Sequence, residues 1–252
     1  MADTLLPQIS QDREQLIDFV QTLVRFETIN PPGNHYLETC EFLATSLRNL
    51  GLETSIHRVP DREIRTKRPD LAGYPRANVL ARWDTGSQRT IHFNAHYDVV
   101  PVSGQWKHGP FEAALDGDWI YGRGTADMKG AIGSLFQVLA AYRRLNRNPP
   151  VNIEISLTAD EETDSAFGAA WVVEQGLVHA DWVVVCEGGS GLSIGCGHNG
   201  VVWLEVTVLG RAAHGAHPRK VINAVEKMCR LVTALERYQK RLERRTFVAP
   251  DG

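Results

Sequence analysis

Apolar residues recur at helical spacing in several parts of the chain. The helices predicted from this spacing cover residues 12–27, 36–50, 127–145, 166–175 and 221–242. The first three have clear ends, because NPPG, Gly51 and NRNPP follow them and none of these continues a helix. Each helix is therefore expected to bury one apolar face.

Between these helices lie short runs of β-branched and apolar residues that predict strands. They are ETSIHRV, ANVLARW, RTIHFNA, VNIEISLT and DWVVVCE. The DTGSQ turn between the second and third runs indicates a hairpin, residues 61–75 indicate a basic surface loop, and DWVVVC is typical of a strand buried on both faces. Strands that alternate with helices predict an α/β fold with a mixed, largely parallel sheet flanked by helices.

The character of the chain changes near His198. The segment VVWLEVTVLG predicts a long strand with two alternating faces, and GRAAHGAHP predicts a loop before the last helix. We therefore place a domain boundary here, with a first domain over residues 1–198 and the start of an α+β domain over residues 199–252.

Composition and charge narrow the classes of partner. The chain has 252 residues, of which 43% are hydrophobic and 23% charged, enough for one large domain or two smaller ones. A net charge of −3 provides no polycationic face for nucleic acid or anionic lipid. No stretch approaches the roughly 18 apolar residues of a membrane span. We expect no nucleic-acid or membrane partner.

The cysteines bear on the cellular compartment. Cys40, Cys186, Cys196 and Cys229 are widely spaced, form no C-x-x-C pair and follow no secretory signal. This pattern indicates reduced thiols in a soluble, cytoplasmic protein, and it disfavours metal binding through cysteine.

Acidic and histidine residues follow three of the predicted strands. RTIHFN runs into AHYD, VNIEISLT into ADEE, and DWVVVC into EGG. Ligands bind beyond the carboxyl ends of strands in open α/β sheets, so these endings are expected to share one crevice. The crevice would hold His96, Asp98, Glu161, Glu162 and Glu187, with Asp127 of GRGTADMKG within reach. One imidazole with several carboxylates suits zinc, cobalt or manganese, and two such ions would activate water for hydrolysis.

Each of these residues also has a purely structural interpretation. His96 and Asp98 can form a buried histidine–carboxylate pair, and Asp127 can cap the helix that follows it. The acids of ADEETDS can favour the positive end of the next helix, which is the interpretation we prefer for Asp164. Separate caps and turns do not explain why three strand endings carry acids towards one edge.

The motifs HYDVVP, GRGTADMKG, ADEETDSAFG, VCEGG and GRAAHGAHP occur in this order along the chain. Together they resemble the di-zinc amidohydrolase and metallopeptidase family of aminoacylase, acetylornithine deacetylase, succinyl-diaminopimelate desuccinylase, carnosine dipeptidase and glutamate carboxypeptidase. The resemblance implies a di-zinc exopeptidase-like fold, with a metal-binding catalytic domain over residues 1–198 and part of a lid and dimerisation domain over residues 199–252.

The resemblance also implies roles for individual residues. His96 and Glu187 match ligands of the first metal, Asp127 matches the carboxylate that bridges two metals, and Glu162 matches a ligand of the second metal. The family has a cis peptide bond after the bridging acid, which here would join Asp127 to Met128.

Three further residues match catalytic positions. Glu161 matches the general base that takes a proton from water and passes it to the departing nitrogen, and Asp98 matches the acid that orients His96. His214 matches a lid histidine that reaches the partner's active site in family dimers and steadies the oxyanion.

The implied function is metal-dependent hydrolysis of an amide bond in an N-acyl amino acid or short peptide, closest to deacetylases and desuccinylases. The alternatives are a dipeptidase or carboxypeptidase of the same family, or a truncated, non-catalytic metal-binding or interaction module. The implied cofactor is Zn²⁺, two per complete site, with Co²⁺ or Mn²⁺ as substitutes, and the implied assembly is a homodimer through the lid.

The chain departs from the family at its carboxyl end. Family members are usually much longer, and no histidine follows His217 to complete the second metal site. The chain is interpreted as an amino-terminal portion that binds at most one metal tightly and is nearly inactive alone.

Overall fold

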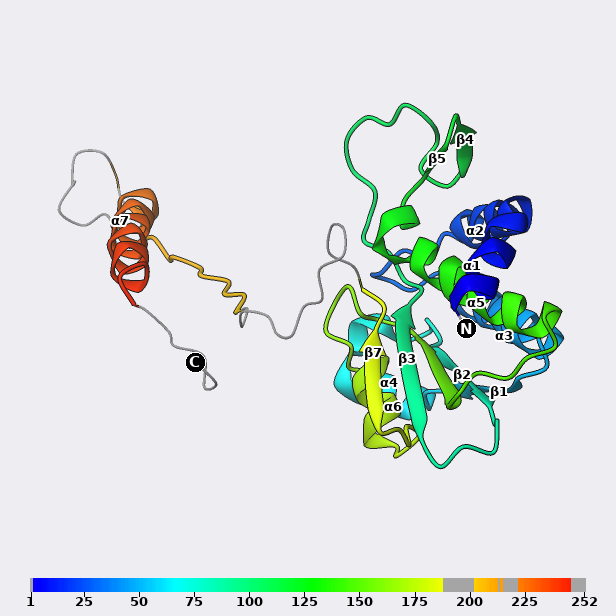
Figure 1. The fold of residues 1–252 in the computed structure, drawn as a ribbon. Coiled ribbons are helices and arrows are strands. Elements are labelled where there is room, and N and C mark those ends of the chain that lie inside the picture. Colours follow the sequence, from blue (N-terminus) through cyan, green and yellow to red (C-terminus); the bar gives the residue numbers. More distant parts are fainter. Residues whose placement is uncertain (1, 188–201, 213, 215–221, 246–252) are drawn as a thin grey trace. The chain divides into compact units, whose positions relative to one another are not determined.

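The computed structural model describes residues 2–187, 202–212, 214 and 222–245 (Figure 1). The chain divides into two compact units, Met1–Ile194 and Gly195–Gly252. Each unit is considered by itself.

A mixed sheet forms the centre of the first unit. Its strands are β1 (Glu53–Arg58), β2 (Ala77–Trp83), β3 (Thr90–His96), β6 (Asn152–Thr158) and β7 (Trp182–Val185), and their order is β1-β2-β6-β3-β7. β3 is parallel to both β6 and β7, whereas β2 is antiparallel to both β1 and β6. The predicted α/β class with a mixed sheet is confirmed.

The predicted hairpin between β2 and β3 is wrong, because β6 lies between these two strands and pairs with both. The turn that joins them is fixed from β6 instead. Asn152 accepts a hydrogen bond from the backbone N–H of Thr85 (2.9 Å) and donates one to the carbonyl oxygen of Ser87 (2.8 Å). All seven positions of β6 are buried, which accounts for its place inside the sheet.

Helices cover both faces of this sheet (Figure 1). The larger core joins the strands to α2 (Arg13–Arg25), α3 (Tyr36–Asn49) and α5 (Gly130–Arg144), and α1 (Ala2–Gln11) packs against α5. Side chains alternate along a strand, so Val79 and Ala81 of β2 enter this core whereas Leu80 faces the smaller core on the other side. That smaller core includes residues of α4 (Asp61–Lys67) and α6 (Ala169–Glu174).

Residues 61–75 are not the surface loop that the sequence indicates. They form α4 and a 3₁₀ turn, η1 (Pro69–Leu71), and they bury Ile64 and Leu71 against Phe167 and Trp171. This stretch is rich in charged residues, but its two buried apolar residues hold it against the smaller core. A short hairpin of β4 (Ala114–Asp116) and β5 (Trp119–Tyr121) is a further element that the sequence analysis did not predict.

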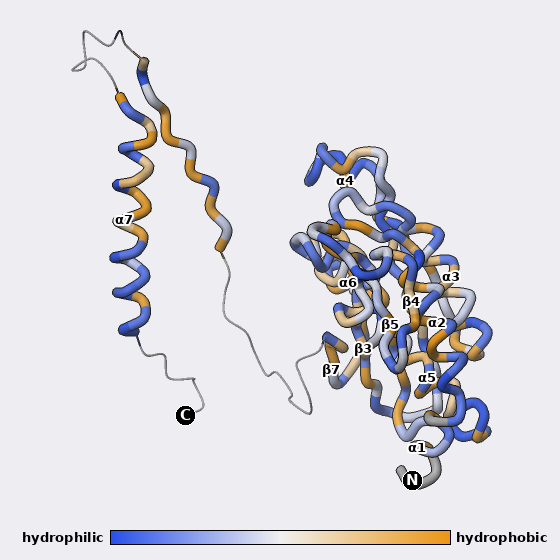
Figure 2. Tube along the Cα trace, turned by 90° about the horizontal axis from the view of Figure 1, so that it is seen from above, coloured by the Kyte–Doolittle hydropathy of each residue, from blue (hydrophilic) through white to orange (hydrophobic). Residues whose placement is uncertain are grey.

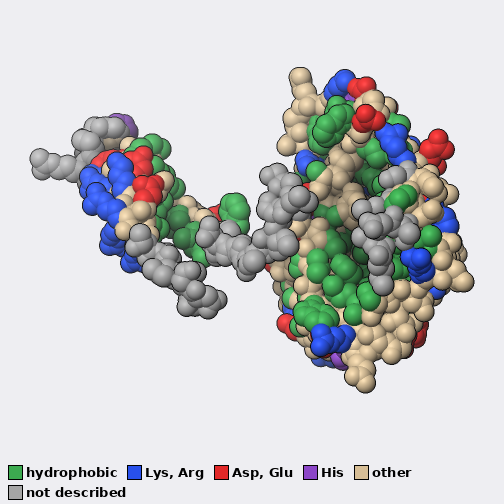
Figure 3. All heavy atoms as spheres, in the orientation of Figure 1, with side chains coloured by type: hydrophobic (Ala, Val, Ile, Leu, Met, Phe, Trp, Pro, Cys, Tyr) green, Lys and Arg blue, Asp and Glu red, His purple; other side chains and the backbone are tan. Residues whose placement is uncertain are grey.

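β7 is also more exposed than its apolar sequence predicts. In the described part of the first unit it lies at the sheet edge beyond β3, and its four side chains are 40–58% exposed. Figure 3 shows hydrophobic side chains gathered on the face of the first unit seen in that view. An uninterrupted apolar run therefore indicates a strand here, but not one that is buried on both faces.

The second unit contains helix α7 (Ala224–Leu242), whose first turn is capped by the side chain of Asn223. Residues 202–210 do not form the predicted strand, and the bridge described in the second unit joins Arg211 to Ile222, which lie outside this segment. Apolar and polar residues alternate around α7 (Figure 2), and none of its residues is buried. A strand requires a partner for its backbone groups, and residues 202–210 have none in the described residues. None of the described helices is both long and apolar enough to cross a bilayer.

Candidate metal centre

The structure brings the predicted strand endings to one place at the carboxyl edge of the sheet. His96 is the last residue of β3, the Glu161–Glu162 pair follows β6, and Glu187 follows β7. The Nε2 atom of His96 lies 2.9 Å from Asp127 Oδ1, 3.8 Å from Glu161 Oε2 and 4.0 Å from Glu187 Oε2. Acids from three separate segments therefore surround one imidazole nitrogen.

Three of these residues form a group suited to a metal ion. One ligand atom each from His96, Asp127 and Glu187 lies within 4.8 Å of the other two. One imidazole nitrogen and two carboxylate oxygens are a donor set that fits zinc and similar borderline divalent ions, with room for further ligands. The residues present therefore fit a divalent metal.

The imidazole of His96 is fixed from its other side. Its ring is buried, its Nδ1 lies 3.0 Å from the carbonyl oxygen of Asp98 and 3.4 Å from the carboxylate Oδ1, and its backbone N–H donates to the sulfur of Met128. The nearest acceptor for Nδ1 is thus the carbonyl of Asp98 rather than the carboxylate that the sequence analysis proposed. With Nδ1 engaged in this way, Nε2 faces the acids.

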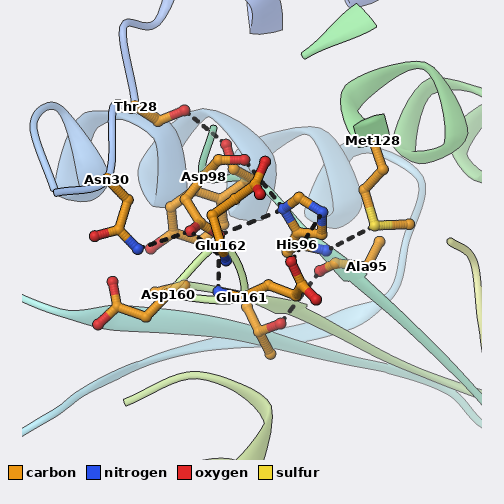
Figure 4. A network of polar contacts seen from close by, with 12 residues as sticks. Thr28, Asn30, Ala95, His96, Asp98, Met128, Asp160, Glu161 and Glu162 are labelled. Carbon is orange, nitrogen blue, oxygen red and sulfur yellow. Dashed lines mark hydrogen bonds and ion pairs between the residues drawn. The ribbon is translucent and has the colours of Figure 1, made fainter. Parts of the chain in front are cut away.

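The carboxylate of Asp98 has another set of partners (Figure 4). Oδ1 accepts the backbone N–H of Glu161 at 3.2 Å, and Oδ2 accepts that of Glu162 at 3.2 Å. Asn30 also donates from Nδ2 to Oδ2 at 2.9 Å. Asp98 therefore joins β3, which ends at His96, to the acidic turn, which we define as residues 160–165. Asn30 was missed in the sequence analysis, where NPPG was treated only as a helix stop.

The loop that carries Glu161 and Glu162 is closed by a glycine. A Cβ atom added to Gly168 would lie 1.8 Å from the carbonyl oxygen of Ala159, the residue that directly follows β6. The two ends of the ADEETDSAFG segment, Ala159 and Gly168, therefore lie in close contact, and only a residue without a side chain at position 168 permits this approach.

Asp127 does not open α5, which begins at Gly130 after the single turn η2 (Thr125–Lys129). Its backbone is extended, with φ −131° and ψ 98°, and the N-cap residue of α5 is Lys129. The cap interpretation is therefore wrong. The Asp127–Met128 peptide bond is cis, as the family resemblance implied.

Lys129 ties the same segment to the end of α2, a role that the sequence analysis did not predict. Its ammonium group is buried and donates to the carbonyl oxygens of Leu23 (3.1 Å) and Phe26 (2.8 Å) at the end of α2. Burial lowers the pKa of Lys129 to about 7, because the charged form loses its hydration. Because Lys129 follows Asp127 by two residues, this contact helps to hold Asp127 near His96.

The acids at the site perturb one another. Burial raises the pKa of Glu162 to about 7, and the charge of Asp127 adds to this rise. Burial also raises the pKa of Glu161, although His96 opposes the shift. Burial lowers the pKa of His96, but hydrogen bonding to Asp98 and the surrounding carboxylates outweigh it and raise the pKa to about 9. The site thus concentrates negative charge, which a cation would relieve.

Other predicted residues are placed less closely. Glu162 lies in the acidic turn but outside the three-residue ligand group. His214 is exposed and belongs to the second unit, so its catalytic role stays a prediction. Cys40, Cys186 and Cys229 are free thiols, and Cys196 lies outside the described residues.

Residues 92–245 match the model of Peptidase family M20/M25/M40. The chain belongs to this family. The match extends over His96, Asp127, the acidic turn and Glu187, and it continues into the second unit.

The curated relatives agree with this membership. The chain is 34% identical over 170 residues to a succinyl-diaminopimelate desuccinylase of Dinoroseobacter shibae, covering 63% of this chain and 44% of the relative. It is 29% identical over 250 residues to that of Orientia tsutsugamushi, covering 95% and 60%. The chain thus spans about half the length of the curated relatives that it matches.

Two structural neighbours show the same fold at low identity. Human carnosine dipeptidase 1 matches with a TM-score of 0.60 and 20% identity, over 73% of this chain and 41% of that one. The M20 family metallo-carboxypeptidase Sso-CP2 from Sulfolobus solfataricus matches with 0.58 and 23%, over 69% and 37%. The di-zinc exopeptidase-like fold implied by the motifs is therefore confirmed.

Proposed function

We propose that this chain carries the metal centre of a hydrolase that cleaves an amide bond in an N-acyl amino acid or a short peptide. The observation that supports this most directly is the convergence of His96, Asp127 and Glu187 within 4.8 Å at the carboxyl edge of the sheet. A general acid–base candidate, Glu161, lies beside this group, 3.8 Å from His96 Nε2.

His96, Asp127 and Glu187 would hold a divalent ion, which we propose to be Zn²⁺ with Co²⁺ or Mn²⁺ as substitutes. When bound, such an ion supplies Lewis-acid chemistry: it polarises a carbonyl group and makes a water molecule more acidic. Asp98 keeps Nδ1 of His96 occupied so that Nε2 remains the ligand atom. Glu161, with its side chain 40% exposed, takes the proton of the attacking water at Oε2 and delivers it to the departing amide nitrogen.

The substrate is proposed from the curated relatives. Several of these are named succinyl-diaminopimelate desuccinylase, which favours an N-acyl amino acid as substrate. A dipeptidase or carboxypeptidase activity is the second candidate within the family, whereas the solved neighbours of low identity inform the fold alone. A homodimer in which His214 reaches the partner's site and a cytoplasmic location both belong to this proposal.

Metal stoichiometry follows from the same geometry. Among the described residues we assign Asp127 and Glu162 to a second metal, and two carboxylates are too few to hold zinc tightly. We expect about one Zn²⁺ or Co²⁺ per chain, measured by elemental analysis after dialysis. Two tightly bound ions per chain would contradict this assignment of ligands.

The function is tested by Glu161→Gln in the full-length protein, assayed with N-succinyl and N-acetyl amino acids and with dipeptides. The expected result is loss of turnover with Co²⁺ retained, because the amide cannot accept the proton but the metal ligands remain. Unchanged turnover would remove Glu161 as the base. Metal binding without turnover in the wild type for all three substrate classes would favour a metal-binding module instead.

A further inference from the structure

Asp160 lies between β6 and the Glu161–Glu162 pair and has no role in the proposed reaction. It is buried, and its backbone adopts a left-handed conformation with φ 58°, which Asp tolerates better than most residues. Its Oδ2 accepts a hydrogen bond from Nε of Arg76 (2.9 Å), and its Oδ1 accepts one from the hydroxyl of Tyr36 (3.0 Å). A buried, fully paired carboxylate thus directly precedes two acids of the candidate site.

The partners of Asp160 are themselves held from several sides. Arg76 is fully buried, donates from Nη1 to the carbonyl oxygen of Tyr74 (2.9 Å) and lies 5.2 Å from the centre of the Tyr36 ring. A Cβ atom at Gly33 would lie 2.6 Å from Nη1, so the chain leaves space for the guanidinium only because glycine stands there. These neighbours confine the guanidinium beside Asp160, although its Nη2 atom is buried and makes no hydrogen bond among the described residues.

The backbone of Asp160 directs the residues that follow it. Its carbonyl oxygen accepts the N–H groups of Ser165 (2.7 Å), Asp164 (3.3 Å) and Thr163 (3.4 Å), which closes the turn. The backbone N–H groups of Glu161 and Glu162, the two residues directly after Asp160, point at the two carboxylate oxygens of Asp98 (Figure 4). The left-handed residue is thus the point at which the chain turns towards Asp98 and His96.

We propose that Arg76, Tyr36 and Asp160 form a positioning device, the Asp160 anchor, that sets the place of Glu161 and Glu162 relative to His96. The anchor acts through two steps: it fixes the backbone of the acidic turn, and that backbone donates two hydrogen bonds to the carboxylate of Asp98, whose own carbonyl oxygen lies 3.0 Å from Nδ1 of His96. This inference rests on the proposed function, because it assigns the anchor to the metal centre described above. It concerns residues outside the predicted ligand and catalytic set.

A role in core stability alone makes a different prediction. If the anchor merely stabilises the fold, its loss lowers the melting temperature but leaves the Glu161 and Glu162 amides bonded to Asp98. If it positions the turn, those two amides and the metal site change together while the rest of the sheet stays intact.

The main test variant is Tyr36→Phe in the full chain, which removes one hydroxyl and keeps the ring beneath Arg76. Its matched control is Tyr97→Phe, because the buried hydroxyl of Tyr97 donates to the carbonyl oxygen of Ala77 (2.6 Å) and not to Asp160. The first measurement is amide hydrogen exchange at Glu161 and Glu162, compared with exchange along β6. The second is Co²⁺ affinity together with the visible absorption spectrum of the bound ion.

We expect exchange at the two amides to become at least about tenfold faster in Tyr36→Phe, with β6 unchanged. Co²⁺ binding should weaken, towards the roughly 10–100-fold loss typical of outer-shell partners, and the spectrum should shift. Tyr97→Phe should change neither readout. A folded Tyr36→Phe protein with a lower melting temperature but unchanged amide exchange and Co²⁺ spectrum would overturn the proposal.

Two further variants keep the test decisive if Tyr36→Phe does not fold. Asp160→Asn retains the left-handed preference but weakens the pairing with Arg76, and Arg76→Lys retains the charge but not the directed Nε donor. Both should accelerate hydrogen exchange at the amides of Glu161 and Glu162. Added Co²⁺ should slow this exchange least in Asp160→Asn. Unaltered exchange in both contradicts the anchor. If the wild type binds no Co²⁺, the proposed metal centre fails, whereas the exchange measurement still decides on the anchor.

Discussion

β3 carries two buried histidines on the same face of the sheet, and their surroundings differ. His92, in the middle of the strand, contacts Glu154 at 2.9 Å and Ser156 at 2.7 Å, and burial lowers its pKa. His96, at the carboxyl end, is equally buried, yet neighbouring acids raise its pKa to about 9. Burial is therefore common to both histidines; what distinguishes His96 is its position at the strand end, where loops bring acids together.

The largest expected effect separates these two histidines by metal binding. His96→Gln removes the only nitrogen from the candidate ligand group, so its Co²⁺ affinity should fall by more than the roughly 100-fold that loss of an outer-shell partner causes. His92→Gln should bind Co²⁺ as the wild type does, measured by calorimetric titration of both proteins. Equal losses in the two variants would show that the strand end is not special.

The next effect tests the residue that connects His96 to the acidic turn. In Asp98→Asn, one of the two backbone N–H groups of Glu161 and Glu162 meets an amide NH₂ instead of an acceptor. We expect Co²⁺ affinity to drop by about 10–100-fold and the free energy of unfolding to fall by about 1–3 kcal/mol. Chemical denaturation and metal titration measure the two losses, with His92→Gln as the control for the second. A stable variant with normal affinity would contradict the role of Asp98.

The pH dependence of stability provides a further test of the difference between the two histidines, through the lowered pKa of His92. Its folded-state pKa is lowered, so the unfolded chain binds a proton more readily, and the stability contributed by neutral His92 is lost as pH falls below about 6.5. Glu154 is the charged group that faces His92, and Arg82 lies 3.4 Å from the same carboxylate.

The slope from this one group is at most about 1.4 kcal/mol per pH unit. It should be absent in His92→Gln, as measured by urea unfolding between about pH 5 and pH 7.5. An identical pH profile for His92→Gln and the wild type would mean that His92 is not the titrating group.

The smallest effect is expected at Asp164, an acid of the same ADEETDS segment that lies outside the site. Its Oδ1 accepts the N–H of Ala166 at 3.0 Å in an exposed turn, and its carboxylate lies 3.7 Å from Arg68. Asp164→Ala should lower the free energy of unfolding by less than about 1 kcal/mol and leave Co²⁺ affinity unchanged. A loss of affinity similar to that of Asp98→Asn would show that charge in this segment matters more than geometry.

Much of the fold was predictable from local pattern. The strands β2, β3 and β6 were located from short runs of β-branched and apolar residues, and α2 and α3 from helical spacing and their stop signals. The three strand endings with acids also predicted which residues meet, because the carboxyl ends of parallel strands lie at one edge. These features depend on residues close together in the sequence.

Strand neighbours were not predictable in the same way. β6 and β7 both flank β3 and both have apolar runs, yet β6 is buried throughout whereas β7 is an exposed edge in the described residues. The sequence of β2, DTGSQ and β3 suggested a hairpin, which β6 prevents by pairing with both strands. Which strand occupies the middle depends on the summed burial of the whole sheet and not on the turn between two strands.

The sequence by itself determined the family, the order of the motifs and the residues that form the candidate metal centre. Only the tertiary structure decided how these residues are held. Asn30 and the acidic turn donate hydrogen bonds to Asp98, and Lys129 donates to the carbonyl oxygens at the end of α2. Arg76 and Tyr36 donate to Asp160. These supporting contacts join residues 63 to 124 positions apart. Hydrogen bonds of this kind leave no periodic trace in a sequence, because their partners meet only after the sheet and its helices have packed.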